Sequence, residues 1–552
     1  MVSSKKKMLV VGLDSGTWRV LDPLMERGCM PFMQGLVRRG ARGILRSTVP
    51  PVTAAAWTSF LTGLNPGAHG LFNFWMHDPN TYDARYVDGS ARKSRPLWTY
   101  LNDAGLKTGL VNVPMTYPVK PLDGFMISGL LTPKAAEDFC YPSELRERIR
   151  ERWPNYMFTF EWVHYRYDMP RLVDRLLRWL DQQSDVCSYL MREQPWDVFA
   201  TVITQTDVMQ HAAMHLIEEG IIGNNRAHRS AVALIEKFYS RVDAAFQRLV
   251  EEAGADVPVI VLSDHGSERT RKVAYLDELL AQGDFLHYFP SSRFRGVRER
   301  TVQHAKVLFE RLDWLHVHAR LLRTRPRLLV TTNRQRRSSI DFARSRAFSS
   351  GSYGGSYPGV SVNLKGRERS GIVEPGEEYE KIRNSVIELL RECKDVEGSP
   401  VFEDVFRRED VYNGQFVNAA PDVVPIPAAG YAVLGKRGAA GAVVSDPEPG
   451  MIPGAHSPEG MILLAGPGAA NEDISSGADM CDVLPTILHW LGLKLPRGFD
   501  GCVLHEFFTP ELAGSEIQYS EVDARRTTDA GAAEGATQES IKQRLRGLGY
   551  LD

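Results

Sequence analysis

The sequence lacks the features that mark membrane-spanning and secreted proteins. It has no stretch of roughly 18 apolar residues, the length that a transmembrane helix needs. Its first apolar run, MLVVGL, ends at Asp14 and is shorter than the roughly 7–15 residues of a secretory signal core. No small-residue cleavage site follows this run. These absences predict a cytoplasmic protein.

Cysteine is scarce and the net charge is close to zero. The cysteines show no C-x-x-C spacing, which argues against a disulfide framework and against a thiolate zinc site; they are Cys29, Cys140, Cys187, Cys393, Cys481 and Cys502. The formal net charge is -2, which leaves no overall field to attract nucleic acid or an anionic membrane. We therefore expect buried free thiols and no specific nucleic-acid partner.

What the sequence does contain is an alternation of apolar strands and amphipathic helices. Its 552 residues can build one large domain with insertions or two to three domains. Continuous apolar runs predict strands at 8–14, 107–113, 197–204, 257–264 and 461–468. Helical periodicity is seen at 95–105, 171–193, 228–254 and 377–393. This alternation predicts an α/β fold with helices on both faces of a mainly parallel sheet, whose ligands bind where strands end.

One basic stretch interrupts this pattern. Residues 293–346 contain 15 Lys/Arg against 4 Asp/Glu. We interpret 266–339 as an inserted cap between two parts of a catalytic core, 1–265 and 340–520, and 521–552 as a flexible linker with a C-terminal helix that docks back. The basic stretch is either a solvated helix and loop, or a segment that makes weak contact with an anionic membrane surface or holds a polyanionic substrate.

Aspartate and histidine recur where strands end. Asp14 ends the first predicted strand and Asp264-His265 ends another; each can hold a divalent cation or simply cap a helix. Asp207 and His211 are four residues apart, so a helix would place them on one face. That pair is either two ligands of one metal or a hydrogen-bonded surface pair.

Two further histidines are weaker candidates when each is considered alone. His215 continues the helical face of Asp207 and His211, where it is either a third ligand or a supporting or surface residue. His456 lies in the loop PGAHSPEG just before the last predicted strand. A single loop histidine commonly binds nothing.

Thr53 is the best-presented hydroxyl. Pro50-Pro51 cannot continue a helix, whereas the following AAAWTSFL can form one, so Thr53 falls at or near a helix N-terminus. Free amides and the helix dipole favour an anion there, such as an alkoxide or a phosphoryl group. The same position also suits a plain helix cap. Thr58, Ser59 and Thr62 lie within the helix and are less well presented.

The order of these segments resembles the alkaline phosphatase superfamily, most closely its type I phosphodiesterase/nucleotide pyrophosphatase branch. The resemblance covers most of the chain and is weakest around 270–340. It matches Asp14 at the first strand end, Thr53 before a T-G-x-x-P-x-x-H-G element at 62–70, Asp207 and His211 in D-x-x-x-H, Asp264 and His265 in D-H-G, and His456 in G-x-H. It implies a three-layer α/β/α sandwich with a mainly parallel central sheet and an inserted cap region.

The resemblance also implies a mechanism. Thr53 would be the nucleophile, itself bound to a metal, and would form a phosphothreonine intermediate on a small-molecule phosphate ester, expected to be a phosphodiester. A nucleotide-type substrate is one option, but the sequence has Ala56 where the nucleotide-cleaving members of the branch carry Asn. The ligands of one divalent ion would be Asp14, Asp264 and His265. Those of the other would be Asp207, His211 and His456. Zinc is the expected metal, with manganese or cobalt as alternatives.

Several alternatives stay open from the sequence. A phosphomonoesterase is one alternative. A phosphomutase fits less well, because mutases of the superfamily place a Ser nucleophile in a different local sequence. A non-catalytic anion-binding scaffold would keep only the fold. A sulfatase does not fit, because the sequence around Thr53 has no C/S-x-P-x-R element. Lys365, Arg367 and Arg369 are either substrate contacts or surface charges. The oligomeric state is not predicted.

Overall fold

The protein is built around one large sheet. The computed structural model describes residues 7–289, 338–350, 357–448, 451–526 and 537–548. The nine strands, in spatial order, are β20 (Asp473–Asp479), β2 (Gly40–Arg46), β19 (Glu459–Ala465), β9 (Val259–Leu262), β1 (Met8–Leu13), β8 (Val198–Ile203), β5 (Thr108–Val113), β6 (Gly124–Ser128) and β7 (Cys140–Tyr141). All five predicted strands are present. The sequence did not predict β2, β6, β7 and β20.

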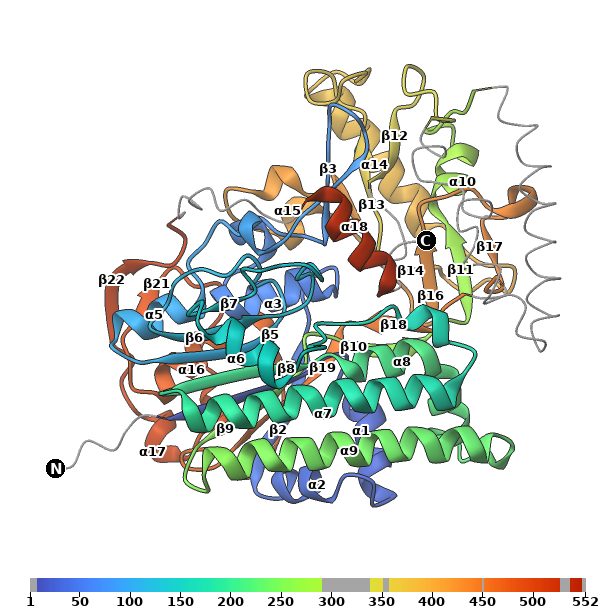
Figure 1. The fold of residues 1–552 in the computed structure, drawn as a ribbon. Coiled ribbons are helices and arrows are strands. Elements are labelled where there is room, and N and C mark those ends of the chain that lie inside the picture. Colours follow the sequence, from blue (N-terminus) through green and yellow to red (C-terminus); the bar gives the residue numbers. More distant parts are fainter. Residues whose placement is uncertain (1–6, 290–337, 351–356, 449–450, 527–536, 549–552) are drawn as a thin grey trace.

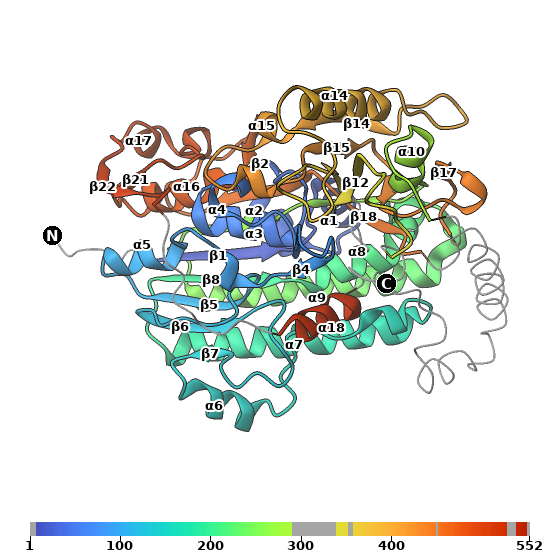
Figure 2. The same cartoon turned by 90° about the horizontal axis from the view of Figure 1, so that it is seen from above.

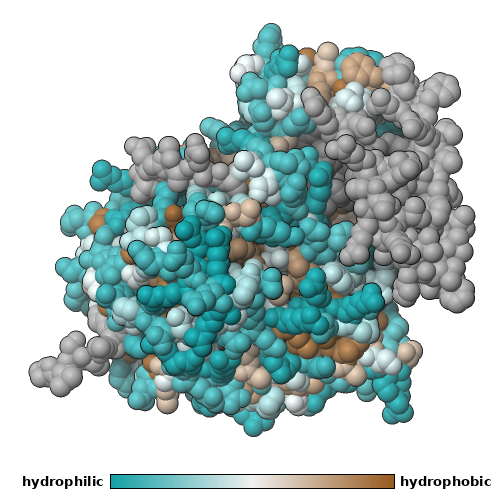
Figure 3. All heavy atoms as spheres, viewed as in Figure 1, coloured by the Kyte–Doolittle hydropathy of each residue, from teal (hydrophilic) through white to brown (hydrophobic). Residues whose placement is uncertain are grey.

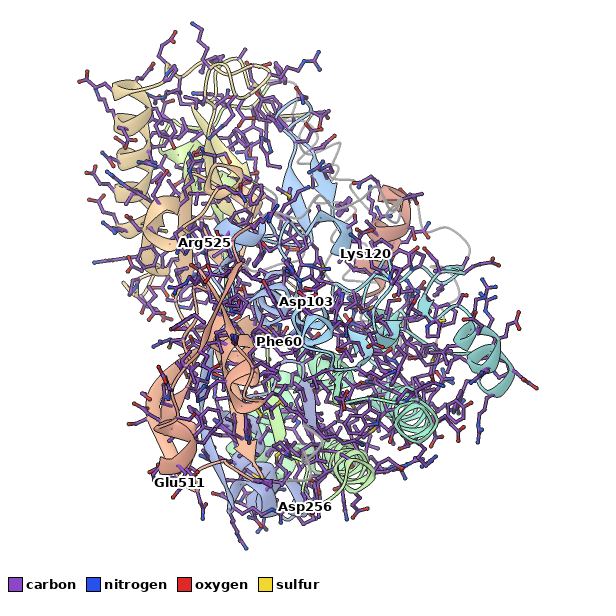
Figure 4. The ribbon with its side chains drawn as sticks, turned by 90° about the vertical axis from the view of Figure 1, so that its left-hand side faces the viewer. Phe60, Asp103, Lys120, Asp256, Glu511 and Arg525 are labelled. Atoms are coloured by element: carbon purple, nitrogen blue, oxygen red, sulfur yellow. The ribbon has the colours of Figure 1, made fainter. Side chains whose placement is uncertain are left out.

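Both faces of this sheet are buried under helices, as predicted. Successive residues of a strand point to opposite faces, and β1 shows the result: Leu9 and Val11 join one apolar cluster, while Met8 and Val10 join another. The first cluster is covered by α1 (Trp18–Glu26), α2 (Pro31–Val37), α7 (Met169–Glu193), α8 (Gln205–Leu216) and α9 (Arg229–Ala253). The second is covered by α3 (Thr53–Thr62), α5 (Leu97–Asp103) and α16 (Val483–Trp490). Figure 1 shows the two helical layers, and Phe60 of α3, labelled in Figure 4, belongs to the second.

The sheet is mainly parallel, as predicted, and one of the five predicted strands runs in the opposite direction. Strands β1, β8, β9, β5 and β6 run parallel to their neighbours in this group. The predicted strand 461–468 corresponds to β19, which runs antiparallel to both β9 and β2. Because β19 runs in this direction, the residues just before it lie at the edge of the sheet where β1, β8 and β9 end.

A second group of sheets stands above that edge (Figures 1 and 2). It contains the strands β12 (Ala347–Ser350), β13 (Gly359–Val362), β15 (Val423–Pro427) and β14 (Phe402–Arg407), and a smaller sheet of β16 (Tyr431–Leu434), β11 (Lys272–Tyr275) and β17 (Val444–Ser445). Helices α10 (Leu276–Gln282) and α14 (Glu377–Arg391) pack on them. These elements share a separate apolar cluster. We call them the upper lobe.

The upper lobe draws on more of the chain than the predicted cap. Residues 347–445, assigned from the sequence to the core range 340–520, form most of its strands rather than extending the nine-stranded sheet. Their apolar side chains pack against α10 and β11, which belong to the predicted insertion 266–339. Most of the basic stretch 293–346, including 294–322, lies outside the described residues, so its role stays a prediction. The exact domain division also stays a prediction.

The smaller elements connect these parts. They are α4 (Pro66–His69), β3 (Trp75–His77), β4 (Ala84–Tyr86), α6 (Leu145–Arg152), β10 (Gly266–Arg269), α15 (Arg408–Val411), β18 (Gly454–Ser457), β21 (Leu495–Arg497), α17 (Pro510–Ala513), β22 (Tyr519–Asp523) and α18 (Gln538–Gly547). Lys120, which follows β5, lies toward the upper lobe in Figure 4, whereas Asp256, which precedes β9, lies at the opposite end of the molecule. The carboxyl edge of the sheet therefore faces the upper lobe.

The C-terminal helix docks back onto the protein, as the sequence suggested. Ile541, Leu545 and Leu548 pack into one apolar cluster with residues from α3, β3 and the loop after β5. The side chain of Gln538 exchanges hydrogen bonds with the backbone of Tyr86 in β4, at 2.7 Å in each direction. In both Figure 1 and Figure 2 this helix lies over the carboxyl edge of the sheet.

The surface shown in Figure 3 is largely hydrophilic, with apolar residues in small separate patches. Within the described part of the chain, no helix combines the length and apolar character needed to cross a bilayer. The cysteines are free thiols; four are buried, Cys481 is partly buried, and Cys502 is exposed, contrary to the expectation that all would be buried.

Candidate active site

The predicted residues meet at the carboxyl edge of the sheet. Asp14 follows β1, and Asp264 and His265 lie between β9 and β10. Asp207 and His211 lie on α8, which begins directly after β8. His456 is in β18, the strand that pairs with β10 and precedes the antiparallel β19.

Asp14, Asp264 and His265 form the first group. Their potential ligand atoms lie within 4.8 Å of one another. His265 Nε2 is 3.2 Å from Asp264 Oδ2 and 3.8 Å from Asp14 Oδ1. All three residues are buried. The spacing suits oxygen and nitrogen ligands converging on one ion.

Asp207, His211 and His456 form the second group. Asp207 Oδ1 is 3.2 Å from His211 Nε2 and 3.7 Å from His456 Nε2, and the two Nε2 atoms are 3.1 Å apart. The i, i+4 pair on α8 therefore does share a face, as predicted. The two groups adjoin, because the rings of His265 and His456 stack with centroids 3.6 Å apart.

Each of the three histidines is oriented by a backbone carbonyl. His211 Nδ1 lies 2.9 Å from the oxygen of Gly454, His265 Nδ1 lies 3.0 Å from that of Gly266, and His456 Nδ1 lies 2.8 Å from that of Pro51. A carbonyl can only accept, so Nδ1 carries the proton and donates. The lone pair of each ring then belongs to Nε2, the atom that faces the carboxylates. This is the arrangement that metal-binding histidines normally adopt.

The carboxylates present unsatisfied oxygens to these nitrogens. Asp14 Oδ1, Asp207 Oδ1 and Asp264 Oδ2 are buried and accept no hydrogen bond from the described residues. The pKa of Asp14 is raised well above its ordinary value by burial and by the nearby Asp264 and Asp207. Burial also raises the pKa of Asp264. Buried lone pairs that face one another in this way fit divalent cations, which would satisfy all of them together.

Thr53 lies directly beside the first group. It is the first residue of α3 and is fully buried. Its Oγ1 is 3.2 Å from His265 Nε2. The helix cap is Val52, which has extended backbone, so the alternative that Thr53 is merely a cap is wrong. The positive end of the α3 dipole therefore points at the hydroxyl and at any anion next to it.

The other hydroxyls of α3 are occupied elsewhere. Thr58 donates to the carbonyl of Ala54, and Thr62 donates to that of Thr58. Ser59 Oγ is 3.0 Å from His69 Nε2. None of these three bonds reaches the two groups, which supports the choice of Thr53. His215 belongs to neither group among the described residues; burial lowers its pKa beside Arg269.

The sequence did not predict several residues that support this site. Trp162 stacks on the ring of His211, with centroids 6.2 Å apart and planes at 11°. Tyr357 donates a hydrogen bond to the backbone oxygen of His456 at 3.1 Å. Neither residue stands near a ligand in sequence, and no local pattern would have identified them.

Gly454 could have been recognised from the G-x-H motif. A Cβ on this residue would lie 2.4 Å from the backbone oxygen of Gln210 and 2.8 Å from the Cα of His211. Only glycine permits this close approach of β18 to α8. The approach brings the carbonyl of Gly454 to His211 and places His456 beside it.

A cavity of about 280 Å³ lies between this edge and the upper lobe. Its wall includes Pro50, close to Thr53 in the chain, and Tyr357, which touches His456. Aromatic and apolar side chains contribute most of the lining, among them Phe72, Trp75 and Met76.

The three basic residues considered from the sequence as substrate contacts differ in position. Arg367 lines the cavity, but its guanidinium is bound to Asp422 at 2.6 Å. Lys365 pairs with Glu374 at the surface. Arg369 donates its backbone N–H to the oxygen of Pro79 at 3.0 Å. Lys365 is therefore a surface charge, and Arg367 forms part of the cavity wall.

Comparison with known families identifies the family of this chain. The family profile described as type I phosphodiesterase/nucleotide pyrophosphatase matches residues 8–458, a range that includes every residue of the two groups and Thr53. The chain belongs to the type I phosphodiesterase/nucleotide pyrophosphatase family. As a member of this family, the protein is a phosphoric ester hydrolase. No curated protein matches the sequence.

Solved structures agree with the fold. A phosphonoacetate hydrolase from Sinorhizobium meliloti 1021, in complex with phosphonoformate, is 14% identical, with a TM-score of 0.53 over 88% of this chain and 95% of its own. Murine ectonucleotide pyrophosphatase/phosphodiesterase 5 is 13% identical, with a TM-score of 0.45 over 88% and 95% of the two chains. The sheet order of this phosphodiesterase-family protein and its likeness to the phosphonoacetate hydrolase agree with the predicted α/β architecture and its mainly parallel central sheet.

Proposed function

We propose that this protein is a metal-dependent phosphodiesterase that acts through Thr53. The observation that carries the proposal is the position of Thr53 Oγ1, 3.2 Å from His265 Nε2 and at the N-terminus of α3. A hydroxyl at this position has a cation site on one side and a helix dipole on the other. Both favour the alkoxide over the neutral alcohol.

The residues divide between two divalent cations. Asp14, Asp264 and His265 would hold the ion next to Thr53, which would complete its ligands. Asp207, His211 and His456 would hold the other. When bound, the ions would supply Lewis-acid charge to the attacking and leaving oxygens. Zinc suits the nitrogen and oxygen ligands best, with manganese and cobalt as alternatives.

The reaction follows from these positions. Thr53 gives up its proton to solvent water, and its oxygen forms a bond to phosphorus while the bond from phosphorus to the leaving oxygen breaks. The leaving oxygen takes a proton from water. A second water then attacks phosphorus, the bond from phosphorus to the Thr53 oxygen breaks, and the threonine regains its proton. The first turn of α3 stabilises negative charge on the phosphoryl oxygens in both steps.

The neighbouring cavity favours an ester with an apolar group. Its aromatic lining would bury a flat substituent, which an aryl or nucleoside ester possesses and inorganic phosphate lacks. The cytoplasmic location expected from the sequence stays a prediction. A monoesterase, a mutase or a non-catalytic scaffold would each give a different result in the following test.

The test compares substrates and metals in one matrix. Metal-free protein is reconstituted with zinc, manganese or cobalt and assayed on p-nitrophenyl phosphate, bis(p-nitrophenyl) phosphate and a p-nitrophenyl phosphonate. We expect the diester to have the highest kcat/KM. In Thr53→Ala, kcat should fall by at least about 1,000-fold while bound metal stays at the wild-type level. Full activity of Thr53→Ala would remove Thr53 from the mechanism, and wild-type inactivity with every metal would favour the scaffold.

A further inference from the structure

The C-terminal helix α18 carries an arginine that its surroundings do not explain. Arg544 is only 7% exposed. Its Nε and Nη2 are buried and find no hydrogen-bond acceptor among the described residues. Burial lowers the pKa of Arg544 to about 10, which still leaves the guanidinium charged at neutral pH.

Other buried arginines of the protein have acceptors. Arg383 donates to Glu380 and Glu409, Arg408 donates to Asp422, and Arg92 donates to the backbone oxygen of Met115. A buried guanidinium is normally found only where carboxylates, carbonyls or phosphates accept its hydrogen bonds. Among the described residues, Arg544 therefore lacks the hydrogen-bond acceptors that these other buried arginines have.

Helix α18, which carries Arg544, packs over the catalytic edge (Figure 1). Residues on the same helix face, Ile541 and Leu545, pack in a cluster with Val52 and Ala54, which flank Thr53. One turn after Arg544, the backbone oxygen of Leu548 accepts a hydrogen bond of 2.9 Å from Trp162 Nε1. Trp162 in turn stacks on His211. Thus α18 contacts the supports of both the nucleophile and the second ligand group.

Glu161 is the carboxylate of the protein itself that could pair with Arg544. Its charge acts on the pKa of Arg544, but the side chain is exposed and lies 3.3 Å from Lys134. Close packing fixes this neighbourhood, because a Cβ on Gly547 would lie 2.8 Å from Glu161 Cγ. The glycine lets the helix approach the 161–162 segment without bringing Glu161 into a bond with Arg544.

We infer that Arg544 binds a second anionic group of the substrate, a phosphate or carboxylate separate from the phosphoryl group that Thr53 attacks. Arg544 lies on α18 and is none of the candidate ligands, which follow β1 and β9 or lie on α8 and β18. A planar guanidinium fork suits two oxygens of one anion. The substrate class is thus a phosphoric ester with an additional negative charge. This inference rests on the proposed function for the identity of the site, but binding can be measured without turnover.

The test uses two ligands that differ only in that charge. Binding of 3-phosphonopropionate and of propylphosphonate to zinc-loaded full-length protein is measured by isothermal titration calorimetry. We expect the carboxylate-bearing ligand to bind at least about tenfold more tightly to the wild type, as a charge-assisted hydrogen bond implies. In Arg544→Met, which keeps an apolar stem, the ratio should fall to about one, and Arg544→Lys should lie between.

Two controls separate this role from a structural one. Glu161→Gln should leave the ratio at or above the wild-type value, because it keeps Arg544 and removes a negative charge that acts on the guanidinium. Propylphosphonate binding should also change less than about twofold in Arg544→Met, which shows that the site itself is intact. A wild-type ratio near one, or an unchanged ratio in Arg544→Met, would overturn the inference. Wild-type protein that binds the two ligands with the expected ratio but hydrolyses no ester would instead count against the proposed mechanism alone.

Discussion

Replacing Asp14 with Asn should stabilise the metal-free protein and weaken the metal-loaded one. Asp14, Asp207 and Asp264 are buried together, and one oxygen of each lacks a hydrogen bond from the described residues. Without cations these charges repel one another. An amide at position 14 removes one charge and can donate a hydrogen bond to Asp264, but it is a poorer ligand than a carboxylate.

The size of the effect follows from the spacing. The ligand atoms of Asp14 and Asp264 lie within 4.8 Å of each other. Two unit charges at that distance repel by roughly 3 kcal/mol at an effective dielectric constant of about 20. Protonation relieves part of this repulsion, so we expect a gain of roughly 1–3 kcal/mol. For a chain of 552 residues this corresponds to a rise in Tm of roughly 1–3 °C.

Metal binding should reverse the order of the melting temperatures, so that wild type melts above Asp14→Asn. A cation at 1,000 times its Kd adds about 4 kcal/mol per site. Wild type should therefore gain roughly 7 °C from two sites and Asp14→Asn about half of that. Differential scanning calorimetry with and without zinc, together with bound-metal analysis, measures both changes.

A matched substitution at Asp243 provides the control. This carboxylate is also buried, but it accepts hydrogen bonds from the backbone amides of Phe32 and Met33 at 2.9 and 2.8 Å. Asp243→Asn should lower the metal-free Tm and leave the zinc-induced gain unchanged. If metal-free Asp14→Asn melted below wild type while keeping the full zinc response, the argument from buried, repelling ligands would be refuted.

Three further outcomes are expected. The Tm advantage of metal-free Asp14→Asn over wild type should be small below pH 3.8, the ordinary carboxyl pKa, and should grow as the pH rises. The reason is that the pKa of Asp14 is raised in the folded wild type, so the folded wild type loses stability as the pH rises and Asp14 ionises, whereas the asparagine variant does not. A pH series of melting curves in which the advantage does not grow would contradict this. Trp75→Ala should raise KM for bis(p-nitrophenyl) phosphate by about 3–10-fold, because Trp75 lines the cavity, and should leave inhibition by inorganic phosphate unchanged; equal effects on both ligands would place the ester elsewhere. Trp162→Leu should weaken one zinc site by about tenfold in chelator competition, whereas Trp162→Phe, which keeps a ring over His211, should stay near wild type; equal loss in both would exclude the stacking contact as the cause.

Much of the catalytic edge could be predicted because its determinants are local. Asp14 and Asp264 follow apolar strands directly, and Asp207 and His211 share a helix face through their i, i+4 spacing. Parallel strands bring their carboxyl ends to one edge, so the residues that follow them converge. The prolines before Thr53 and the helix-forming run after it fixed the helix N-terminus within a residue.

The rest depended on contacts between distant segments. Nothing in the sequence near His456 states that β19 runs antiparallel, yet that direction alone brings His456 to the other ligands. The carbonyls that orient the histidines, the ring of Trp162 over His211, and α18 above the edge come from elsewhere in the chain. Residue type and local spacing therefore determined which side chains could do the chemistry. Packing of remote elements against one another decided which atoms of those side chains face the substrate, because the distances involved are set by tertiary contacts and not by neighbouring residues.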